Sequence, residues 1–434
     1  MFPDDPVQAK RSAPARSSFY YGWIMLVIAS LTAFMSGPGQ TYGVSVFVDP
    51  MIDTFGWSRT TISGLYTAGS LTAATAMLLV GRLLDRYGAR VLLTVVVVLF
   101  GLAAIWMSRV SHIVELYIGF TLLRTLGQGS MSLIPSTMVA LWFVRLRGRA
   151  HALYALGGAT SQAALPPFIY LIISVMGWRD TWIVLGIMIW VILLLPSALL
   201  VRRSPEAVGL LPDGDRISSL DVNVQDGAHE RASADWTLGD ALKTKSFWLL
   251  ILAGSSSSLI STALIFHHVS LLGSKGVDAG TAAFVLSILA PVAIVSNFAA
   301  GFLSERYPNR FILMAGNSFL AIAMLSTFTI TGNWQAFVYG GLLGLSNGMT
   351  MTINSVIFPN YYGRAHLGSI KGITSTSQVA FAALGPLPFG YFFDLTGNYA
   401  TVMLLFLALP AFSAGAALMA SPPQRSRTAM LHRL

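Results

Sequence analysis

Long apolar segments separated by short polar ones make up most of this chain. We count twelve runs of about 20 predominantly apolar residues, the length that an α-helix needs to cross the hydrocarbon core of a bilayer. A membrane-spanning segment must satisfy its backbone hydrogen bonds internally, so we expect these runs to be helices. The pattern predicts an all-α integral membrane protein with twelve transmembrane helices. Their approximate cores are 21–48, 60–82, 90–109, 112–142, 151–175, 180–201, 246–273, 280–303, 309–331, 335–358, 367–393 and 399–420.

One half of the chain repeats the other. The segment GRLLDRYGAR at Gly81–Arg90 is echoed by GFLSERYPNR at Gly301–Arg310, and the tetrapeptide Gly148–His151 recurs at Gly363–His366. Internal repeats are typical of membrane transporters in which two bundles move about a central site. The repeat therefore predicts two pseudo-symmetric six-helix bundles. The expected parts are an N-terminal tail at 1–20, bundles at 21–201 and 246–420, a linker at 202–245 and a C-terminal tail at 421–434.

Composition excludes a water-soluble protein. The chain is 54% hydrophobic and 10% charged, with a mean hydropathy of +0.67, whereas about a quarter of the residues of a soluble domain are charged. With no cysteine, disulfides, thiol catalysis and thiolate metal sites are excluded as well.

The distribution of Lys and Arg predicts the orientation, because cytosolic loops collect these residues. With the N-terminus inside, most of the 27 fall in cytosolic segments. The exceptions are Arg59, Arg109, Arg179 and Lys275 outside and Arg124 within the membrane. We expect a multi-pass protein of the cell membrane with both termini cytosolic. The cytosolic basic residues that give the net charge of +9 then face anionic lipid. Because they form no stripe with interleaved aromatic residues, no nucleic-acid partner is expected.

The repeated segment resembles a family signature. Its first copy is similar to the motif Gly-x-x-x-Asp-Arg-x-Gly-Arg-Arg of the major facilitator superfamily, with Ala89 in place of the first Arg of the final pair, and its second copy has Pro308 where the motif has Gly. The resemblance implies transport by alternating access and a cytosolic gate that these charges latch. The same residues could instead serve as topology signals and turn formers. The gate candidates are Asp85, Arg86, Arg90, Glu305, Arg306 and Arg310.

Two further segments carry a narrower resemblance. Val46–Ser63 and Trp142–Gly157 are similar to the branch of monocarboxylate transporters and the oxalate:formate antiporter. That branch moves small carboxylates and holds them with an Arg in helix eight and a Lys in helix eleven. Here Asn297 stands at the first position and Gln378 near the second. The resemblance implies a small organic anion such as a monocarboxylate, while the missing cations leave open a neutral or weakly polar solute.

Ionisable residues within the spans are few, and each is a candidate for function because burying it is costly. Arg124 is the fixed charge nearest mid-membrane; it could hold an anion or organise helix contacts. His267 and His268 are adjacent and point about 100° apart on a helix, so we expect at most one to face a cavity, and the resemblance favours His268. With Asp49 they are the candidates for proton coupling; a histidine bonded to backbone at the outer interface is the alternative.

Uncharged polar residues complete the predicted site. Gln40 and Tyr42 follow Gly37–Gly39, where the helix is expected to loosen, and Gln162 and Gln378 occupy corresponding places in the two halves. Asn297, with Asn347 and Asn354, adds amide donors and acceptors. Each residue alone could simply join two helices, but their concentration predicts a polar central cavity that binds a small-molecule substrate.

Signatures of enzymes are missing from the sequence. It contains no Gly-x-x-x-x-Gly-Lys-Ser/Thr loop and no His-Glu-x-x-His motif, which are the usual marks of phosphate loops and zinc proteases. We expect no catalytic residue, no metal and no cofactor. A polytopic membrane enzyme or a receptor without transport is therefore the weaker alternative, and the sequence leaves symport, antiport and uniport open.

Overall fold

The computed structural model describes residues 20–143, 146–214, 236–363 and 367–423. Within these ranges the regular structure is entirely helical, as the sequence predicts. The first half consists of α1 (Gly22–Met35), η1 (Gly37–Gly39), α2 (Thr41–Phe55), α3 (Arg59–Ser108), α4 (Ile113–Leu122), the π-helical η2 (Leu123–Ser130), α5 (Met131–Trp142), α6 (Arg147–Leu195) and η3 (Pro196–Leu200).

The second half follows two short turns of the linker, η4 (Glu206–Val208) and η5 (Pro212–Gly214). It consists of α7 (Leu238–Leu242), α8 (Lys245–Phe266), α9 (His268–Gly273), α10 (Ala279–Arg306), α11 (Asn309–Ser326), η7 (Thr327–Thr329), α12 (Asn333–Tyr362), α13 (Leu367–Leu384), α14 (Pro386–Thr396) and α15 (Ala400–Met419). Asp278 caps α10 by accepting from the N–H of Thr281 at 2.9 Å. Hydrogen bonds from Thr281 hold the pKa of this carboxyl below its ordinary value.

Twelve crossings result from these helices. Nine segments of the described chain are long and apolar enough to span a membrane by length and composition. The longest, 149–200, contains two crossings, because Gly177 breaks α6 with φ 83° and ψ 165°. Segment 113–142 and α12 supply the remaining two. The predicted twelve-helix fold class is confirmed.

Glycine makes the sharp turn between the second and third crossings. Gly88, within the first copy of the repeat, has φ 76° and ψ 165°, a conformation that L-residues rarely adopt. Pro308 holds the corresponding place in the second copy and has φ −55° and ψ 129°. Two different residues therefore end the helix at matched points, which accounts for the substitution in the motif.

Several central crossings are broken in mid-span. The first bends at Gln40, which has φ −83° and ψ 156°, and the seventh bends at His267 between α8 and α9. The eleventh changes direction at Gly385, where an added Cβ would lie 2.2 Å from the carbonyl oxygen of Leu259. Broken helices free backbone groups near the bundle centre, where transporters commonly bind solutes.

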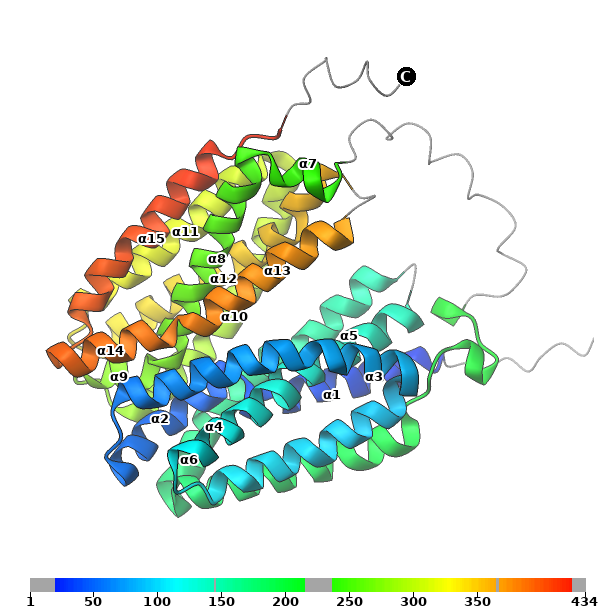
Figure 1. Cartoon of the computed structure of the whole chain (residues 1–434), viewed down its shortest axis with the longest axis horizontal. Coiled ribbons are helices and arrows are strands. Elements are labelled where there is room, and N and C mark those ends of the chain that lie inside the picture. The colour runs from blue at the N-terminus through cyan, green and yellow to red at the C-terminus, as the bar shows by residue number, and fades with distance from the viewer. Residues whose placement is uncertain (1–19, 144–145, 215–235, 364–366, 424–434) are drawn as a thin grey trace, which may run out of the picture.

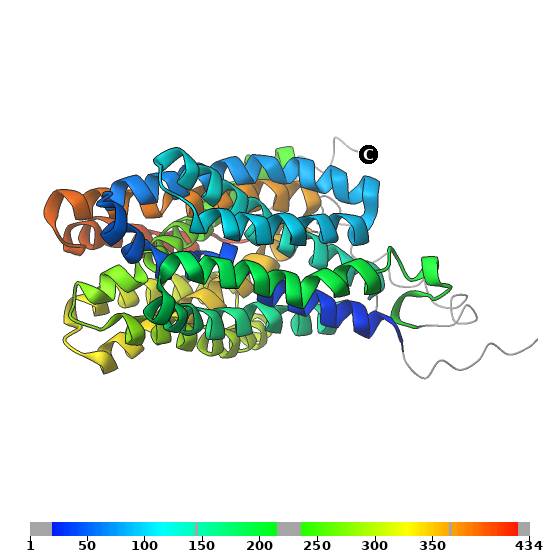
Figure 2. The same cartoon turned by 90° about the horizontal axis from the view of Figure 1, so that it is seen from below.

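The two halves form separate bundles that meet at one end. Figure 1 shows α1–α6 below and α8–α15 above, converging where α2, α9 and α14 lie and diverging toward the linker. The view from below in Figure 2 has the same helices running nearly parallel along the long axis. Large apolar side chains such as Val175, Val191 and Met419 are more than 70% exposed at the outer surface, as expected of a surface that contacts lipid.

Candidate functional site

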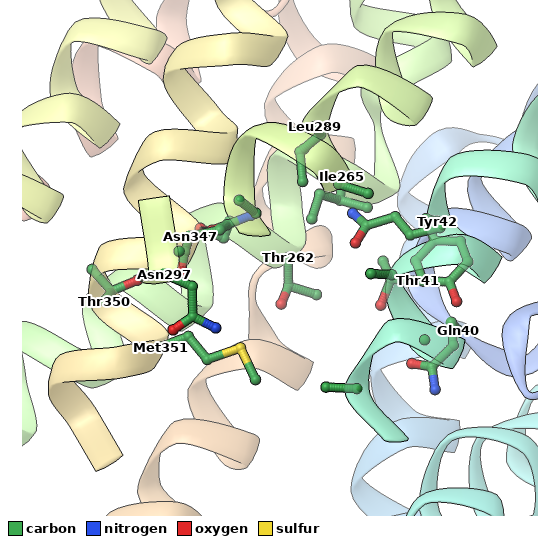
Figure 3. A pocket seen from close by; sticks show the side chains of 18 of the residues that line it. Gln40, Thr41, Tyr42, Thr262, Ile265, Leu289, Asn297, Asn347, Thr350 and Met351 are labelled. Atoms are coloured by element: carbon green, nitrogen blue, oxygen red, sulfur yellow. Dashed lines mark hydrogen bonds between the residues drawn. The ribbon is translucent and has the colours of Figure 1, made fainter. Parts of the chain in front are cut away.

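A cavity of about 660 Å³ lies between the two bundles and takes its wall from both. Figure 3 shows Gln40, Thr41 and Tyr42 on one side of it and Asn297, Asn347, Thr350 and Met351 on the other. A volume of this size is typical of small-molecule sites. Six of the predicted substrate-binding residues line it, namely Gln40, Tyr42, Gln162, Asn297, Asn354 and Gln378.

The N-terminal wall is held by hydrogen bonds within its own bundle. The Tyr42 hydroxyl donates to Ser161 Oγ at 2.9 Å, and Ser161 donates to the carbonyl of Phe34 at 2.6 Å. Gln40 Nε2 donates to Ser36 Oγ at 3.1 Å. These bonds fix Gln40 and Tyr42 where the first crossing breaks, so both side chains are positioned at the cavity.

The C-terminal wall depends on close packing of α12 against α10. Gly340, Gly344 and Gly348 recur every four residues along one face of α12. An added Cβ would lie 2.5 Å from Val285 at Gly340, 2.8 Å from the Leu289 carbonyl at Gly344 and 2.3 Å from the Ala293 carbonyl at Gly348. Small residues at this spacing allow two membrane helices to approach closely. The approach places Asn347 of α12 and Asn297 of α10 on the same wall.

A second pair of amides lies over α8. A Cβ at Gly254 would lie 2.9 Å from Gln378 Nε2 and 3.1 Å from Asn354 Oδ1, so both amides rest against this glycine. The Oδ1 atom of Asn354 is buried and has no hydrogen-bond partner among the described residues. An unpaired acceptor at a cavity wall is available to a ligand.

Arg124 is buried behind the N-terminal wall. It belongs to the π-helical η2, is 7% exposed and is absent from the cavity lining. Its Nε donates to Ser70 Oγ at 3.0 Å, and Nη1 lies 3.4 Å from both the Gly39 carbonyl and Thr41 Oγ1. Because Thr41 lines the cavity, a single hydroxyl separates the guanidinium from it.

Close backbone packing brings Arg124 to this place. A Cβ on Gly39 would lie 2.5 Å from the Leu123 carbonyl and 2.8 Å from the Cα atom of Gly127. The guanidinium also stacks over Tyr66 at 4.9 Å from the ring centroid. In the described part of the chain no carboxylate forms an ion pair with Arg124, so its charge is held by dipoles and an aromatic face.

The two histidines are buried at the break between α8 and α9 and do not line the described cavity. His267 Nε2 donates to the Pro386 carbonyl at 2.9 Å, and its Nδ1 accepts from the Tyr399 hydroxyl at 3.1 Å. His268 Nε2 donates to the Ala282 carbonyl at 3.1 Å. The Nδ1 atom of His268 is buried without a partner among the described residues.

Asp49 belongs to a network that joins the bundles at the end away from the linker. It pairs with Arg59 Nη1 at 2.6 Å and accepts from Ser270 of α9, to which Arg59 also donates. Asp394 of α14 accepts from the N–H of Thr60 at 2.7 Å. This end of the cavity is therefore closed by hydrogen bonds between the two halves.

The repeated motifs make no such bridge in the described contacts. Arg90 Nε donates to the Ala198 carbonyl at 2.7 Å within its own bundle, and Arg86 stacks over Tyr87. In the other half Arg306 stacks over Phe302 and Arg310 over Phe311. The side chains of Asp85 and Glu305 lie outside the part of the chain that the structure describes.

Sequence reasoning missed part of the cavity wall. Ser257 and Ser258, which the predicted site does not include, line the cavity, and so do Ser261 and Thr262. Ser258, Ser261, Thr262 and Ile265 follow the spacing i, i+3, i+4 and i+7, which marks one face of a helix. This spacing is the sequence signal that identifies one face of α8 as a candidate cavity wall. By contrast, no local pattern indicated that Arg59 would meet Asp394.

Charge and metal-binding groups are scarce at the site. No Asp, Glu, Lys, Arg or His lines the cavity described here, and the described residues contain no group of three His, Asp or Glu that could hold a metal ion. The polar side chains that line the cavity described here are hydroxyls and amides. Such a wall can orient a ligand by hydrogen bonds, while the positive charge of Arg124 lies behind the wall, next to Thr41.

A solute cavity between two six-helix bundles, closed at one end by contacts between them, defines a membrane transporter that works by alternating access. The chain matches the Major Facilitator Superfamily over residues 22–386 and 269–432, and it belongs to that superfamily. It is accordingly a multi-pass membrane transporter and not an enzyme.

Relatives and solved structures agree with this family. The chain is 24% identical over 383 residues to the oxalate:formate antiporter of Oxalobacter formigenes, covering 84% of each protein. It is 24% identical over 403 residues to monocarboxylate transporter 2 of Rattus norvegicus, covering 87% of this chain and 78% of that one. A bacterial homolog of the human lysosomal transporter Spinster, in an inward-facing and unoccupied conformation, superposes with a TM-score of 0.71 at 16% identity over 92% of this chain and 97% of that one. The similarity in sequence to those transporters confirms the family branch that Val46–Ser63 and Trp142–Gly157 suggested.

Proposed function

We propose that the protein transports a small organic anion, such as a monocarboxylate, across the cell membrane. The observation that carries the proposal is Arg124, a buried cation without an acidic partner among the described residues and one hydroxyl behind the cavity wall. A buried charge is costly unless something compensates it. An anion in the cavity would supply that compensation during transport.

The contacts of Arg124 leave it able to respond to a ligand. Both bonds from Nη1, to Gly39 and Thr41, are long at 3.4 Å, and Nη2 has no hydrogen-bond partner among the described residues. A carboxylate beside Thr41 would draw on the positive potential of the guanidinium in a site of low dielectric. Relatives named as a monocarboxylate transporter and an oxalate:formate antiporter support the same class of substrate.

A second candidate, a neutral or weakly polar solute, is favoured by one observation. The described cavity wall is uncharged, and Asn297 and Gln378 are amides where the resemblance places cations. On this alternative Arg124 would only hold Gly39, Ser70 and Thr41 together. The two candidates therefore differ in what removing the charge of Arg124 should do.

The proposal includes an orientation. The positive-inside bias assigns both termini and the linker to the cytosol, so the closed network of Asp49, Arg59 and Asp394 would face outward and the cavity would open inward. Alternating access then requires that this network break and that the motif residues Arg86, Arg90, Arg306 and Arg310, with Asp85 and Glu305, latch the cytosolic side. We retain this gate as a proposal.

Coupling to protons is a further part of the proposal. His267, His268 and Asp49 are the candidates, because they are titratable groups within or beside the spans. His267 is the best connected of the three, since Ser63 of α3 lies 3.3 Å from its Nε2 while Pro386 and Tyr399 belong to the other bundle. A proton on His267 would add charge where the bundles touch.

Uptake into proteoliposomes tests the substrate class. Purified Arg124→Gln and Arg124→Lys proteins are compared with the unaltered protein for uptake of labelled monocarboxylates. We expect Arg124→Gln to lose at least about tenfold in uptake, which corresponds to about 1.4 kcal/mol, and Arg124→Lys to retain part of it because the charge remains. Unchanged carboxylate uptake by folded Arg124→Gln protein would contradict the anion proposal and favour a neutral solute.

A further inference from the structure

We propose that the C-terminal wall of the cavity is a donor site for a neutral carbonyl-type oxygen of the substrate, formed by the side-chain nitrogens of Asn297 and Asn347. The inference rests on the proposed function and deepens it. The substrate it predicts is a monoanion: a monocarboxylate that carries a ketone, amide or ester oxygen away from its carboxylate.

Hydrogen bonds inside the protein assign the direction of these two amides. Ser261 Oγ donates to Asn347 Oδ1 at 2.8 Å. Thr352 Oγ1 donates to Asn297 Oδ1, which shares this hydroxyl proton with the carbonyls of Asn297 and Gly348. Each amide oxygen is thus engaged by a hydroxyl of its own bundle. Both side chains line the cavity, and neither Nδ2 has a hydrogen-bond partner among the described residues. The groups left for a ligand are N–H donors.

Helix packing makes the two amides act on one ligand. Gly348 follows Asn347 directly, and a Cβ there would lie 2.9 Å from the backbone nitrogen of Asn297. The glycine therefore holds the two residues side by side across the contact of α12 with α10. In Figure 3 both lie on the wall opposite Gln40, Thr41 and Tyr42.

Charge limits what this wall accepts. The cavity lining described here has no Lys, Arg or His, so a carboxylate bound at Asn297 would lose its hydration without meeting a cation. Burying an ionised carboxylate in that way is far more costly than burying a hydrogen-bonded carbonyl. Arg124 lies behind Thr41, and Figure 3 shows Thr41 on the opposite wall. A substrate with its carboxylate at the wall of Thr41 and its neutral acceptor oxygen at the wall of Asn297 and Asn347 would match both.

Apolar side chains border part of the space between the walls. Ile265, Leu289 and Met351 line it together with several alanines, and Figure 3 shows Ile265 and Leu289 at one border of the cavity and Met351 at another. An alkyl chain between the two polar ends of a ligand would fit this surface. A dicarboxylate would place its second charge against donors that carry no charge.

Binding of three acids of equal chain length tests the inference. Thermal-shift titrations of the full-length protein compare pentanoate, 4-oxopentanoate and pentanedioate, because a ligand of the folded state raises the melting point. We expect 4-oxopentanoate to bind about tenfold more tightly than the other two, as a satisfied buried donor is worth of this order. Asn297→Leu and Asn347→Leu should remove the preference, and Met351→Leu, on the same wall, should keep it.

A second variant guards against misfolding. Asn297→Asp keeps the acceptor for Thr352 and removes both donors, so it too should abolish the preference while its melting point without ligand reports the fold. Equal affinity for pentanoate and 4-oxopentanoate, or a preference that survives the Asn297 and Asn347 substitutions, overturns the inference even if uptake depends on Arg124. If instead pentanoate does not bind but pentan-2-one binds in an Asn297-dependent way, the donor site stands and the anion proposal fails.

Discussion

The backbone N–H of Arg59 donates to Oδ1 of Asp394 at 3.2 Å, across the junction of the two bundles. Arg59 begins α3, and Asp394 lies near the end of α14. The same carboxylate accepts from the N–H and the hydroxyl of Thr60. Asp394 therefore caps the free N–H groups of a helix that belongs to the other half, and its charge complements the helix dipole. The cap exists only while this end of the transporter is closed.

Replacing Asp394 should shift the conformational balance. Asp394→Asn weakens three hydrogen bonds between the bundles, so we expect a larger population that is open at this end, and faster opening. Because the chain has no cysteine, two introduced cysteines, one on α2 and one on α14, can carry spin labels, and the distance between them can be measured. We expect that distance distribution to gain a longer component.

Glu115 provides the matched control. Its carboxylate accepts from the N–H of Ser111 at 2.8 Å and from the N–H of His112 at 3.2 Å, and so caps α4 from within the N-terminal bundle. Glu115→Gln should weaken that cap without lengthening the distance between the bundles. An Asp394→Asn protein with an unaltered distance distribution would show that the cap does not control this gate.

Gly348 should be intolerant of a larger side chain. A Cβ there would lie 2.3 Å from the Ala293 carbonyl, so Gly348→Val must push α10 away from α12 and should cost about 1–3 kcal/mol of stability. Thermal unfolding in detergent measures the loss. Gly341 lies on the same helix with no atom within 4 Å of an added Cβ, and Gly341→Ala should be neutral. Equal melting points for Gly348→Val and Gly341→Ala would refute the packing argument.

His267 should govern any dependence of transport on pH. Gln at this position can still donate to the Pro386 carbonyl, which His267 contacts at 2.9 Å, but it cannot take up a proton. His267 faces Ser63 of α3 and Tyr399 directly, and Asp49, Arg59 and Asp394 surround it electrostatically. We expect His267→Gln to flatten the pH profile of uptake in proteoliposomes while retaining uptake at the higher pH values.

His268→Gln is the comparison for this prediction. The hydrogen bond of His268 to the Ala282 carbonyl and its ring contact with Tyr339 both lie within its own bundle, so its replacement should change the pH profile less. Two profiles identical to that of the unaltered protein would remove both histidines from proton coupling and leave Asp49 as the remaining candidate.

The sequence by itself determined the fold class. Apolar runs long enough to span a bilayer predict helices, because backbone groups in hydrocarbon have no other partner, and the repeat of Gly81–Arg90 at Gly301–Arg310 predicts two related bundles. Gly88 and Pro308 mark matched turns, since Gly88 can adopt the positive φ found there and Pro308 lacks the N–H that a continuing helix needs. These are local properties, and a local pattern is sufficient to encode them.

Only the tertiary structure decided which polar residues share a surface. Arg124 was the obvious charged candidate, yet the close approach of Gly39 to Gly127 leaves it behind the wall and not on it. His267 and His268 point toward helices and away from the cavity. Asp394 meets Arg59 from 335 residues along the chain. Side-chain direction and distant pairing depend on how whole helices pack, and helix packing arises from many contacts that no short segment contains.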